Sequence, residues 1–478
     1  MLTAQLTSHI NTFWDQEILP ALHDYIRIPN ESPLFDPDWQ AHGHMQRAVD
    51  LVAAWIARQA IPGGTVSLLQ DGNRTPLLLI DFPGDLPDTV LMYGHLDKQP
   101  PMVGWRDDLD PWTPHLDAEG RLYGRGAGDD GYAVFTALAT VKTLKDLGQP
   151  HGRIVILIEC SEESGSPDLP YYINTYGASL GTPSLIICLD SGCGNYDQLW
   201  STTSLRGQMV ITLQVEVLHE GVHSGLASGI VPNPFLILRK LLDRLEDTDT
   251  GALRLPELYV PIPDERLRQT AQAASILGGA IVDDFPLLDT VHVLADNPVE
   301  LLLNNSWRPA LAVTGQDGMP SVTQAGNVLL PQLTYKMSLR LPPTLTADTA
   351  AAAVTRLLQS DPPFGARVTV TASGANGWNA PALAPWLDEV TDQSSQEFFG
   401  KGACYIGLGG SIPFMAMLGE RFPEAQFLIT GVLGPHANAH GPNEFLHTPY
   451  AKKLNCCLVR VVAAHYQQAH ERRVAVRS

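Results

Sequence analysis

The sequence predicts an α/β protein in which a mostly parallel β-sheet carries helices on both faces, with a smaller α+β domain inserted into it. Up to about residue 190, short apolar runs typical of buried strands alternate with segments that repeat apolar residues at helical spacing. After Arg206-Gly207, the segments alternate apolar with polar residues, as in a sheet with one face in water. A length of 478 residues also exceeds what one hydrophobic core usually supports, which favours two domains.

The first part of the chain contains helices and strands in alternation. Apolar spacing predicts helices at 4–28, 40–60, 133–147 and 168–177. Strands are expected near 65–70, 76–82, 89–94, 153–160 and 184–189. The continuous apolar run from Ile154 to Ile158 is typical of a strand buried in a parallel sheet.

The inserted domain is predicted from a pattern of strand, helix and strand. Its strands are expected at 208–221, 333–342 and 366–374, and its helices at 234–245 and 346–360. The segment 250–320 is poorly periodic and its elements are not predicted. The chain then returns to the first domain through a helix at 383–398, a strand at 425–430 and a helix at 449–471. The expected domains are therefore 1–204 with 374–478 for the catalytic part, and 205–373 for the insertion.

Composition excludes several classes of protein. A formal net charge of -20 disfavours nucleic acid and anionic membranes as partners. No apolar run approaches the roughly 20 residues of a membrane span, and the N-terminus lacks the charged and apolar regions of a signal peptide. The six cysteines show no C-x-x-C spacing, which favours a reducing compartment over a disulfide scaffold. A cytoplasmic location is expected.

The adjacent carboxylates Glu162 and Glu163 follow the apolar strand 153–160. Two neighbouring carboxylates at such a strand end repel each other and resist burial, so a fold tolerates them when a cation lies there or when water solvates them. Strand ends in α/β sheets are where sites are built. The pair therefore suggests one carboxylate on a metal ion and its neighbour free to move protons; a solvated loop is the alternative.

Other segments repeat this arrangement of an apolar strand followed by ligand-type side chains. YGHLDKQP, GRGAGDDG, LIICLDSG and GPHANAHGPNE supply candidates, namely His95, Asp97, Asp129, Asp130, Asp190 and His440. Together with the glutamate pair they form a dispersed set of histidines and carboxylates. Such a mixture suits two divalent ions that share a carboxylate.

The ordered set of motifs resembles the two-metal exopeptidase and deacylase family. The resemblance covers almost the whole chain and is strongest to the carnosine-type dipeptidase branch, through YGHLDKQP, DPWTPHLDAEGRLYGRGAGDD, EESGS, LRG, HSG and GGSIP. Glutamate carboxypeptidase and acetylornithine deacetylase are more distant relatives. The resemblance implies a zinc-exopeptidase-like fold with an inserted lid and dimerisation domain.

The resemblance also implies a role for each ligand-type residue. It implies His95 and Asp190 on one metal, Glu163 and His440 on the other, and Asp129 bridging both. It implies Glu162 as the general base, acting on a metal-bound water that attacks an amide carbonyl. Asp97 is implied as the partner that orients His95. Two histidines and three carboxylates suit Zn²⁺, with Mn²⁺ or Co²⁺ as alternatives.

Residues outside the metal ligands are implied to bind the substrate. His223 resembles a lid histidine that stabilises the oxyanion and is often donated by the second subunit of a homodimer. Asn327 matches a polar lid position. Arg340 matches an arginine that pairs with the terminal carboxylate of a peptide, and Gly410 and Ser411 match the loop that holds the same carboxylate. A monomer with an enlarged lid is the alternative.

The chain departs from the family pattern at three positions. A lysine of the family's DDKG is replaced by Gly131, and an aspartate two residues before the lid histidine is replaced by Gly221. A glutamate expected ahead of GGSIP, which is thought to hold the free amine of the substrate, is replaced by Leu408.

Three functional hypotheses follow. The preferred one is a metallopeptidase that cleaves small peptides with a free C-terminal carboxylate. The second is an N-acyl or N-carbamoyl amino acid amidohydrolase, which Leu408 favours. A non-catalytic homologue is disfavoured because the five ligands and Glu162 are all present. His436, His447, His219 and His115 are expected to lie outside the ligand set.

Overall fold

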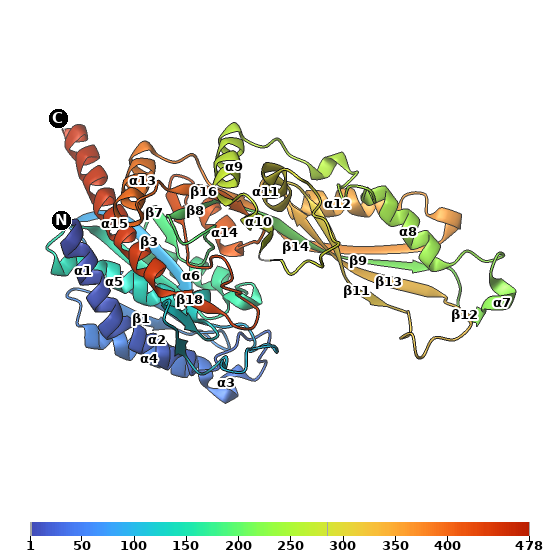
Figure 1. Cartoon of the computed structure of the whole chain (residues 1–478), viewed down its shortest axis with the longest axis horizontal. Helices are drawn as coiled ribbons and strands as arrows, with labels where there is room; N and C mark the ends of the chain where they lie inside the picture. The colour runs from blue at the N-terminus through green and yellow to red at the C-terminus, as the bar shows by residue number, and fades with distance from the viewer. Residues whose placement is uncertain (1, 284, 478) are drawn as a thin grey trace. The chain divides into compact units, whose positions relative to one another are not determined.

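The computed structural model describes residues 2–283 and 285–477, and the chain packs into two compact units (Figure 1). Unit 1 comprises Met1–Thr202, Ala380–Tyr405 and Met417–Ser478, and unit 2 comprises Thr203–Asn379 and Ile406–Ala416. Strands β8 (Trp200–Leu205) and β16 (Cys404–Leu408) carry the chain from one unit to the other. The domain boundaries expected from the sequence, at 204/205 and 373/374, stay a prediction.

The centre of unit 1 is a mixed, mostly parallel sheet, which confirms the predicted fold class. Its strands follow the order β1-β2-β6-β3-β7-β17-β8, and β6, β3, β7 and β17 are parallel to one another. Antiparallel strands flank this core on both sides. The further bounds are β1 Thr65–Leu69, β2 Leu77–Phe82, β3 Leu86–His95, β6 Gly152–Glu159, β7 Pro183–Cys188 and β17 Gln426–Ile429.

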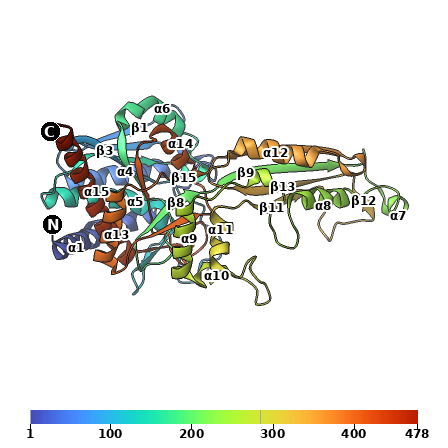
Figure 2. The same ribbon diagram turned by 90° about the horizontal axis from the view of Figure 1, so that it is seen from above.

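Helices cover both faces of this sheet because the two crossovers leave β3 and β6 in opposite directions. Helix α5 (Tyr132–Asp146) connects β3 to β6 on one side, and α6 (Leu169–Leu180) then connects β6 back across to β7. Right-handed crossovers in opposite directions place their helices on opposite faces, as Figure 2 shows for α5 and α6. Helix α15 (Thr448–Arg477) packs against α5, α13 (Pro385–Phe399) and β3.

The N-terminal helices pack on the same side as α5. The predicted helix 4–28 consists of α1 (Thr3–Phe13), a π-helical stretch (Trp14–Ile18) and α2 (Leu19–Ile26), and α4 (His44–Gln59) follows. Lys98, which follows β3, contacts the C-terminal end of α2. Its fully buried ammonium donates hydrogen bonds to the carbonyls of Tyr25 (2.9 Å) and Ile28 (2.7 Å). A cation at a helix C-terminus satisfies carbonyls that lack helical partners.

Unit 2 is built around a four-stranded antiparallel sheet in the order β11-β13-β9-β14. Strand β9 (Gly207–Glu216) buries every second residue, as its alternating sequence predicts. Helices α8 (Pro234–Leu245) and α12 (Ala347–Gln359) pack on one face of the sheet (Figure 1). The other strands are β11 Ala310–Asp317, β13 Gln332–Leu341 and β14 Arg367–Ala375.

Among its described residues, the segment without predicted elements, 250–320, contains three α-helices, a short 3-10 helix (Pro256–Leu258) and the edge strand β11. The α-helices are α9 (Asp264–Leu277), α10 (Ala280–Asp283) and α11 (Pro298–Ser306). The smaller elements of the chain are α3 Trp39–His42, β4 His115–Leu116, β5 Arg121–Tyr123, β10 Val222–His223, α7 Ser224–Ala227, β12 Val328–Leu329, β15 Trp378–Asn379, α14 Pro413–Arg421 and β18 Phe445–His447. Within the described ranges, each helix is too short or too polar to cross a lipid bilayer.

Candidate active site

Three parallel strands of unit 1 end at one edge of the sheet, and each is followed by candidate ligands. In the register, His95 on β3 lies opposite Glu159 on β6, and Tyr93 on β3 lies opposite Cys188 on β7. The Glu162–Ser164 turn follows β6, and Asp190 follows β7. Because the crossovers leave in opposite directions here, this edge is the switch point where α/β sheets bind ligands.

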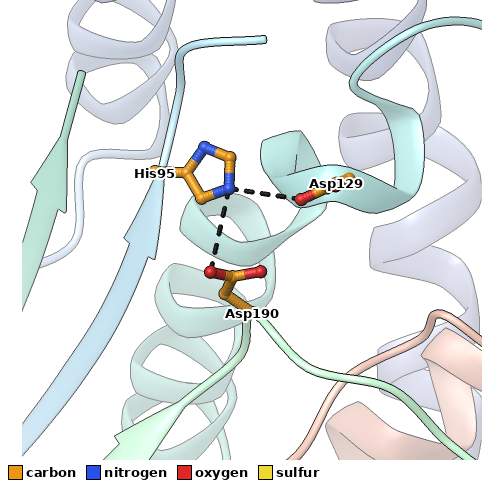
Figure 3. A group of neighbouring side chains, drawn as sticks. All are labelled: His95, Asp129 and Asp190. Atoms are coloured by element: carbon orange, nitrogen blue, oxygen red, sulfur yellow. Dashed lines mark hydrogen bonds and ion pairs between the residues drawn. The ribbon is translucent and has the colours of Figure 1, made fainter. Parts of the chain in front are cut away.

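The first group of candidate ligands consists of His95, Asp129 and Asp190 (Figure 3). His95 Nε2 lies 3.3 Å from Asp129 Oδ1 and 3.9 Å from Asp190 Oδ2. The three ligand atoms lie within 4.8 Å of one another. Asp129 comes from the irregular turn Ala127–Gly131 that precedes α5. Side chains from three separate segments therefore point to one place.

The second group consists of Asp129, Glu163 and His440. His440 Nε2 lies 3.0 Å from Asp129 Oδ2 and 3.3 Å from Glu163 Oε2. Asp129 thus takes part in both groups through different oxygen atoms. The five residues that the sequence suggests as ligands are brought together in this pattern, although their role as ligands stays a prediction.

The charges at this site fit a pair of divalent cations. Burial and neighbouring Asp129 raise the pKa of Glu163 well above its ordinary value, and burial raises the pKa of Asp190 to about 6. Burial also raises the pKa of Asp129, but hydrogen bonds with His440 and His95 outweigh it and lower this pKa. Glu163 Oε1 is buried without a hydrogen-bond partner. Crowded carboxylates of this kind become stable as anions beside a metal ion.

Glu162 lies beside the two groups but belongs to neither. Its Oε2 atom is 4.0 Å from His95 Nε2, and its side chain is 14% exposed. Burial, together with Asp190, raises the pKa of Glu162 well above its ordinary value. A carboxylate in this position is close to the candidate ligands and reachable by water, as a proton carrier must be.

Asp97 fixes the turn that carries the two glutamates. Its Oδ1 accepts a hydrogen bond from the amide of Glu162, and its Oδ2 accepts one from the amide of Glu163, each at 3.0 Å. His95 Nδ1 lies 3.0 Å from the backbone oxygen of Asp97 and 3.5 Å from its Oδ1. The shortest contacts of the Asp97 carboxylate are therefore with the turn rather than with the imidazole expected from the sequence.

Two supporting residues, Gln99 and Glu444, were missed by sequence reasoning. The side-chain amide of Gln99 donates to Glu163 Oε2 at 2.5 Å. Asp130, a candidate from the sequence, lies outside both ligand groups, and its Oδ2 accepts a hydrogen bond from the backbone of His95 at 3.2 Å. Glu444 accepts hydrogen bonds from the loop that carries Asp129. Glu444 stands in the HGPNE motif, four residues after His440, so the sequence motif could have identified it as a residue near the site.

The five expected substrate residues all lie in unit 2, in two places along its chain fold. Arg340 Nη1 donates to Ser411 Oγ at 3.3 Å, and Gly410 precedes that serine. His223 is exposed on β10, and its Nδ1 accepts a hydrogen bond from the amide of Gly225 at 3.1 Å. The backbone oxygen of Asn327 accepts from Ser224, the next residue, at 2.9 Å.

Tight packing explains why glycine occupies position 131. A Cβ atom there would lie 2.2 Å from the Tyr25 ring and 2.6 Å from the Gly126 oxygen, so the family's lysine has no room.

His447, one of the histidines expected outside the ligand set, stacks on Tyr196 at 4.2 Å between ring centroids. Its ring packs against an aromatic neighbour and is absent from both ligand groups.

Comparison with known proteins places this arrangement in a family. Residues 91–464 match the model of peptidase family M20/M25/M40. The chain is 30% identical over 380 residues to the cysteinylglycine-S-conjugate dipeptidase of Corynebacterium striatum, covering 76% of this chain and 77% of that one. It is 27% identical over 369 residues to the Beta-Ala-His dipeptidase of Mus musculus, covering 72% and 71%.

The same relationship is visible in three dimensions. The crystal structure of human carnosine dipeptidase 1 is similar with a TM-score of 0.74 and 21% sequence identity, covering 98% of this chain and 99% of that chain. This likeness concerns the fold, and the family match and the 30% identical relative carry the assignment. The chain therefore belongs to the metallopeptidases of family M20/M25/M40.

Proposed function

We propose that this protein hydrolyses the amide bond of small peptides that carry a free C-terminal carboxylate, with Glu162 as general base. The observation that carries the proposal is the pair of ligand groups that share Asp129, with Glu162 beside them. Two divalent ions, Zn²⁺ in the first place and Mn²⁺ or Co²⁺ as alternatives, would be held by His95, Asp129, Glu163, Asp190 and His440. When bound, they would acidify water and polarise the carbonyl group.

Three residues of the chain are proposed to carry out proton transfer, positioning and oxyanion stabilisation. Glu162 takes a proton from the attacking water and delivers it to the leaving nitrogen. Asp97 holds the backbone of Glu162 and Glu163, so the base and one ligand keep a fixed separation. The oxyanion that develops at the carbonyl oxygen is stabilised by His223, whose ring is exposed to solvent on β10.

A dipeptide is the proposed substrate because the relatives found are named for dipeptides. The Corynebacterium striatum enzyme is a dipeptidase for cysteinylglycine S-conjugates, and the mouse enzyme is one for Beta-Ala-His. Arg340, with Ser411 beside it, is proposed to bind the terminal carboxylate in a charge-assisted hydrogen bond. Gly410 and Asn327 are proposed to line the rest of the substrate site.

The alternative is an N-acyl or N-carbamoyl amino acid amidohydrolase, which Leu408 favours. An apolar, half-buried side chain stands where a glutamate would hold the free amine of a dipeptide. The two functions are separated by incubating metal-loaded protein with a panel of dipeptides and matched N-acyl amino acids, and identifying products by mass spectrometry. Cleavage of dipeptides supports the proposal. Cleavage confined to the N-acyl or N-carbamoyl compounds would replace it by the alternative.

Arg340→Ala is expected to raise KM for substrates that end in a free carboxylate. A charge-assisted contact contributes roughly 1.5–3 kcal/mol, which corresponds to about 10- to 100-fold in KM. The measurement compares a dipeptide with its C-terminal amide in the variant and the wild type. Equal losses on both substrates would contradict the role of Arg340, since the amide lacks the charge that the guanidinium is proposed to bind.

We also propose a homodimer in which His223 of one chain completes the active site of the other. Glu162→Gln and His223→Ala homodimers should each be nearly inactive. A mixed dimer would contain one site with both lesions and one with neither, so random reassortment should restore about a quarter of wild-type activity. Refolded mixtures that contain mixed dimers but regain no activity would show that His223 acts within its own chain or not at all.

The cellular location is proposed to be the cytoplasm. The support is that all six cysteines are buried and free of disulfide bonds, as expected for a protein kept in a reducing compartment.

A further inference from the structure

A buried ion pair between Arg125 and Glu444 lies next to the proposed metal centre without belonging to its ligand set. The Arg125 Nη1 and Glu444 Oε2 atoms are 2.7 Å apart, and the two side chains are 1% and 0% exposed. A buried ion pair gains little net stability over well-packed apolar residues, because both charges lose their hydration. The hydrogen bonds that Arg125 and Glu444 make with neighbouring loops indicate that the pair contributes to the position of these loops rather than to stability.

The Glu444 carboxylate is enclosed by the loop that carries Asp129. Its Oε1 accepts hydrogen bonds from the amides of Gly128 and Asp129, and its Oε2 accepts one from the amide of Gly126, each at 3.1 Å. Three amides of one short loop therefore converge on a single carboxylate. Since one of them belongs to Asp129 itself, Glu444 fixes the backbone from which that side chain projects.

Arg125 holds the loop that carries His440. Its Nη2 donates to the backbone oxygen of Gly441, the next residue, at 2.6 Å. Its Nε donates to the backbone oxygen of Pro100 at 3.0 Å, so the same guanidinium also contacts the chain that follows β3. One side chain thus connects two segments that are far apart in sequence.

The loop around His440 has a backbone that needs such support. Four of its non-glycine residues have positive φ angles, namely His436 (63°), Asn438 (51°), His440 (65°) and Asn443 (63°). This conformation is uncommon for residues with a side chain and persists where surrounding contacts determine it. The contacts of Arg125 with Gly441 and Glu444 lie within this stretch and directly after it.

We propose that the Arg125–Glu444 pair is a positioning device that sets the separation of Asp129 and His440, so that both can approach one divalent ion. The inference rests on the proposed function, because it assumes that these two residues are metal ligands. Each member of the pair holds one ligand-bearing loop, and the ion pair between them couples the two loops. Removing either member should let the loops move independently.

Glu444→Gln keeps the shape of the side chain but removes its charge. Metal-free protein titrated with Zn²⁺ in a calorimeter is expected to show two binding events, and in the variant the weaker one should lose about 10- to 100-fold in affinity. The visible spectrum of Co²⁺-loaded variant should also differ from that of wild type. Arg125→Lys retains the positive charge but offers a single ammonium in place of the planar fork, and should lower the affinity in the same way. If Glu444→Gln does not fold, the Arg125→Lys variant provides the test.

Asp81→Asn is the matched control. It removes the carboxylate of another ion pair of unit 1, with Arg153 at 2.5 Å, on the β2–β6 side of the sheet. This control should bind Zn²⁺ like the wild type. The inference is overturned if Glu444→Gln and Arg125→Lys bind two Zn²⁺ ions with wild-type affinity, even at a lowered melting temperature. Wild-type protein that binds fewer than two ions would instead overturn the proposed function, and this inference with it.

Discussion

Replacement of Glu162 by glutamine should leave both metal ions bound and reduce kcat by about 10²- to 10⁴-fold, the usual contribution of a positioned proton carrier. The amide has the size of the carboxylate but cannot accept a proton from water. Glu162 lies outside both candidate ligand groups, with Oε2 4.0 Å from His95 Nε2, so we expect metal binding without its charge. Steady-state kinetics combined with metal analysis of the same sample measures both effects.

Glu163→Gln is the matched control for this variant, because it makes the same chemical change one residue along the turn. Glu163 contributes its Oε2 atom to the group with Asp129 and His440. Its substitution should lower the affinity for one ion, and added metal should restore part of the activity. If Glu162→Gln loses metal while Glu163→Gln retains it, the roles within the glutamate pair are reversed.

Replacement of Asp129 by alanine should have the broadest effect on the site, since Asp129 is present in both ligand groups. One carboxylate oxygen lies 3.3 Å from His95 Nε2, and the other lies 3.0 Å from His440 Nε2. Both ions should bind more weakly, and activity should fall by about 10³-fold or more, because the charge stabilisation that metal ions supply amounts to several kcal/mol. Calorimetric titration with Zn²⁺ and a peptidase assay at saturating metal test this expectation.

Asp81→Asn again serves as the comparison, since it changes a carboxylate of the same unit that belongs to neither ligand group. It should retain both ions and the activity. If Asp129→Ala binds two ions as tightly as Asp81→Asn, then Asp129 is not a shared ligand and the paired-site proposal fails.

The sequence was most informative where one physical pattern dominates. The apolar run from Ile154 to Ile158 predicts β6, and the alternation after Gly207 predicts β9. The segment 250–320 gave no such pattern, although it contains α9, α11 and β11. Strand β11 lies at the edge of its sheet and is largely exposed, so burial imposes little periodicity on its residues.

The site was predictable for residues at strand ends and less so for those that support them. His95 is the last residue of the apolar strand β3, and Asp190 follows the apolar strand β7, so the sequence pattern identifies both as candidate ligands. The contact of Asp97 with the amides of Glu162 and Glu163 depends on how the turn folds back, which spacing alone does not reveal. Arg125 and Glu444 are separated by more than three hundred residues in sequence, so only the folded chain brings them together.

We propose that this chain holds two divalent ions through ligands that share Asp129. The most direct test is the metal content of wild-type protein after loading with Zn²⁺ and removal of unbound metal by dialysis. We expect two ions per chain. At most one ion per chain after full loading would contradict the proposal, because the two ligand groups would then not act as two metal sites.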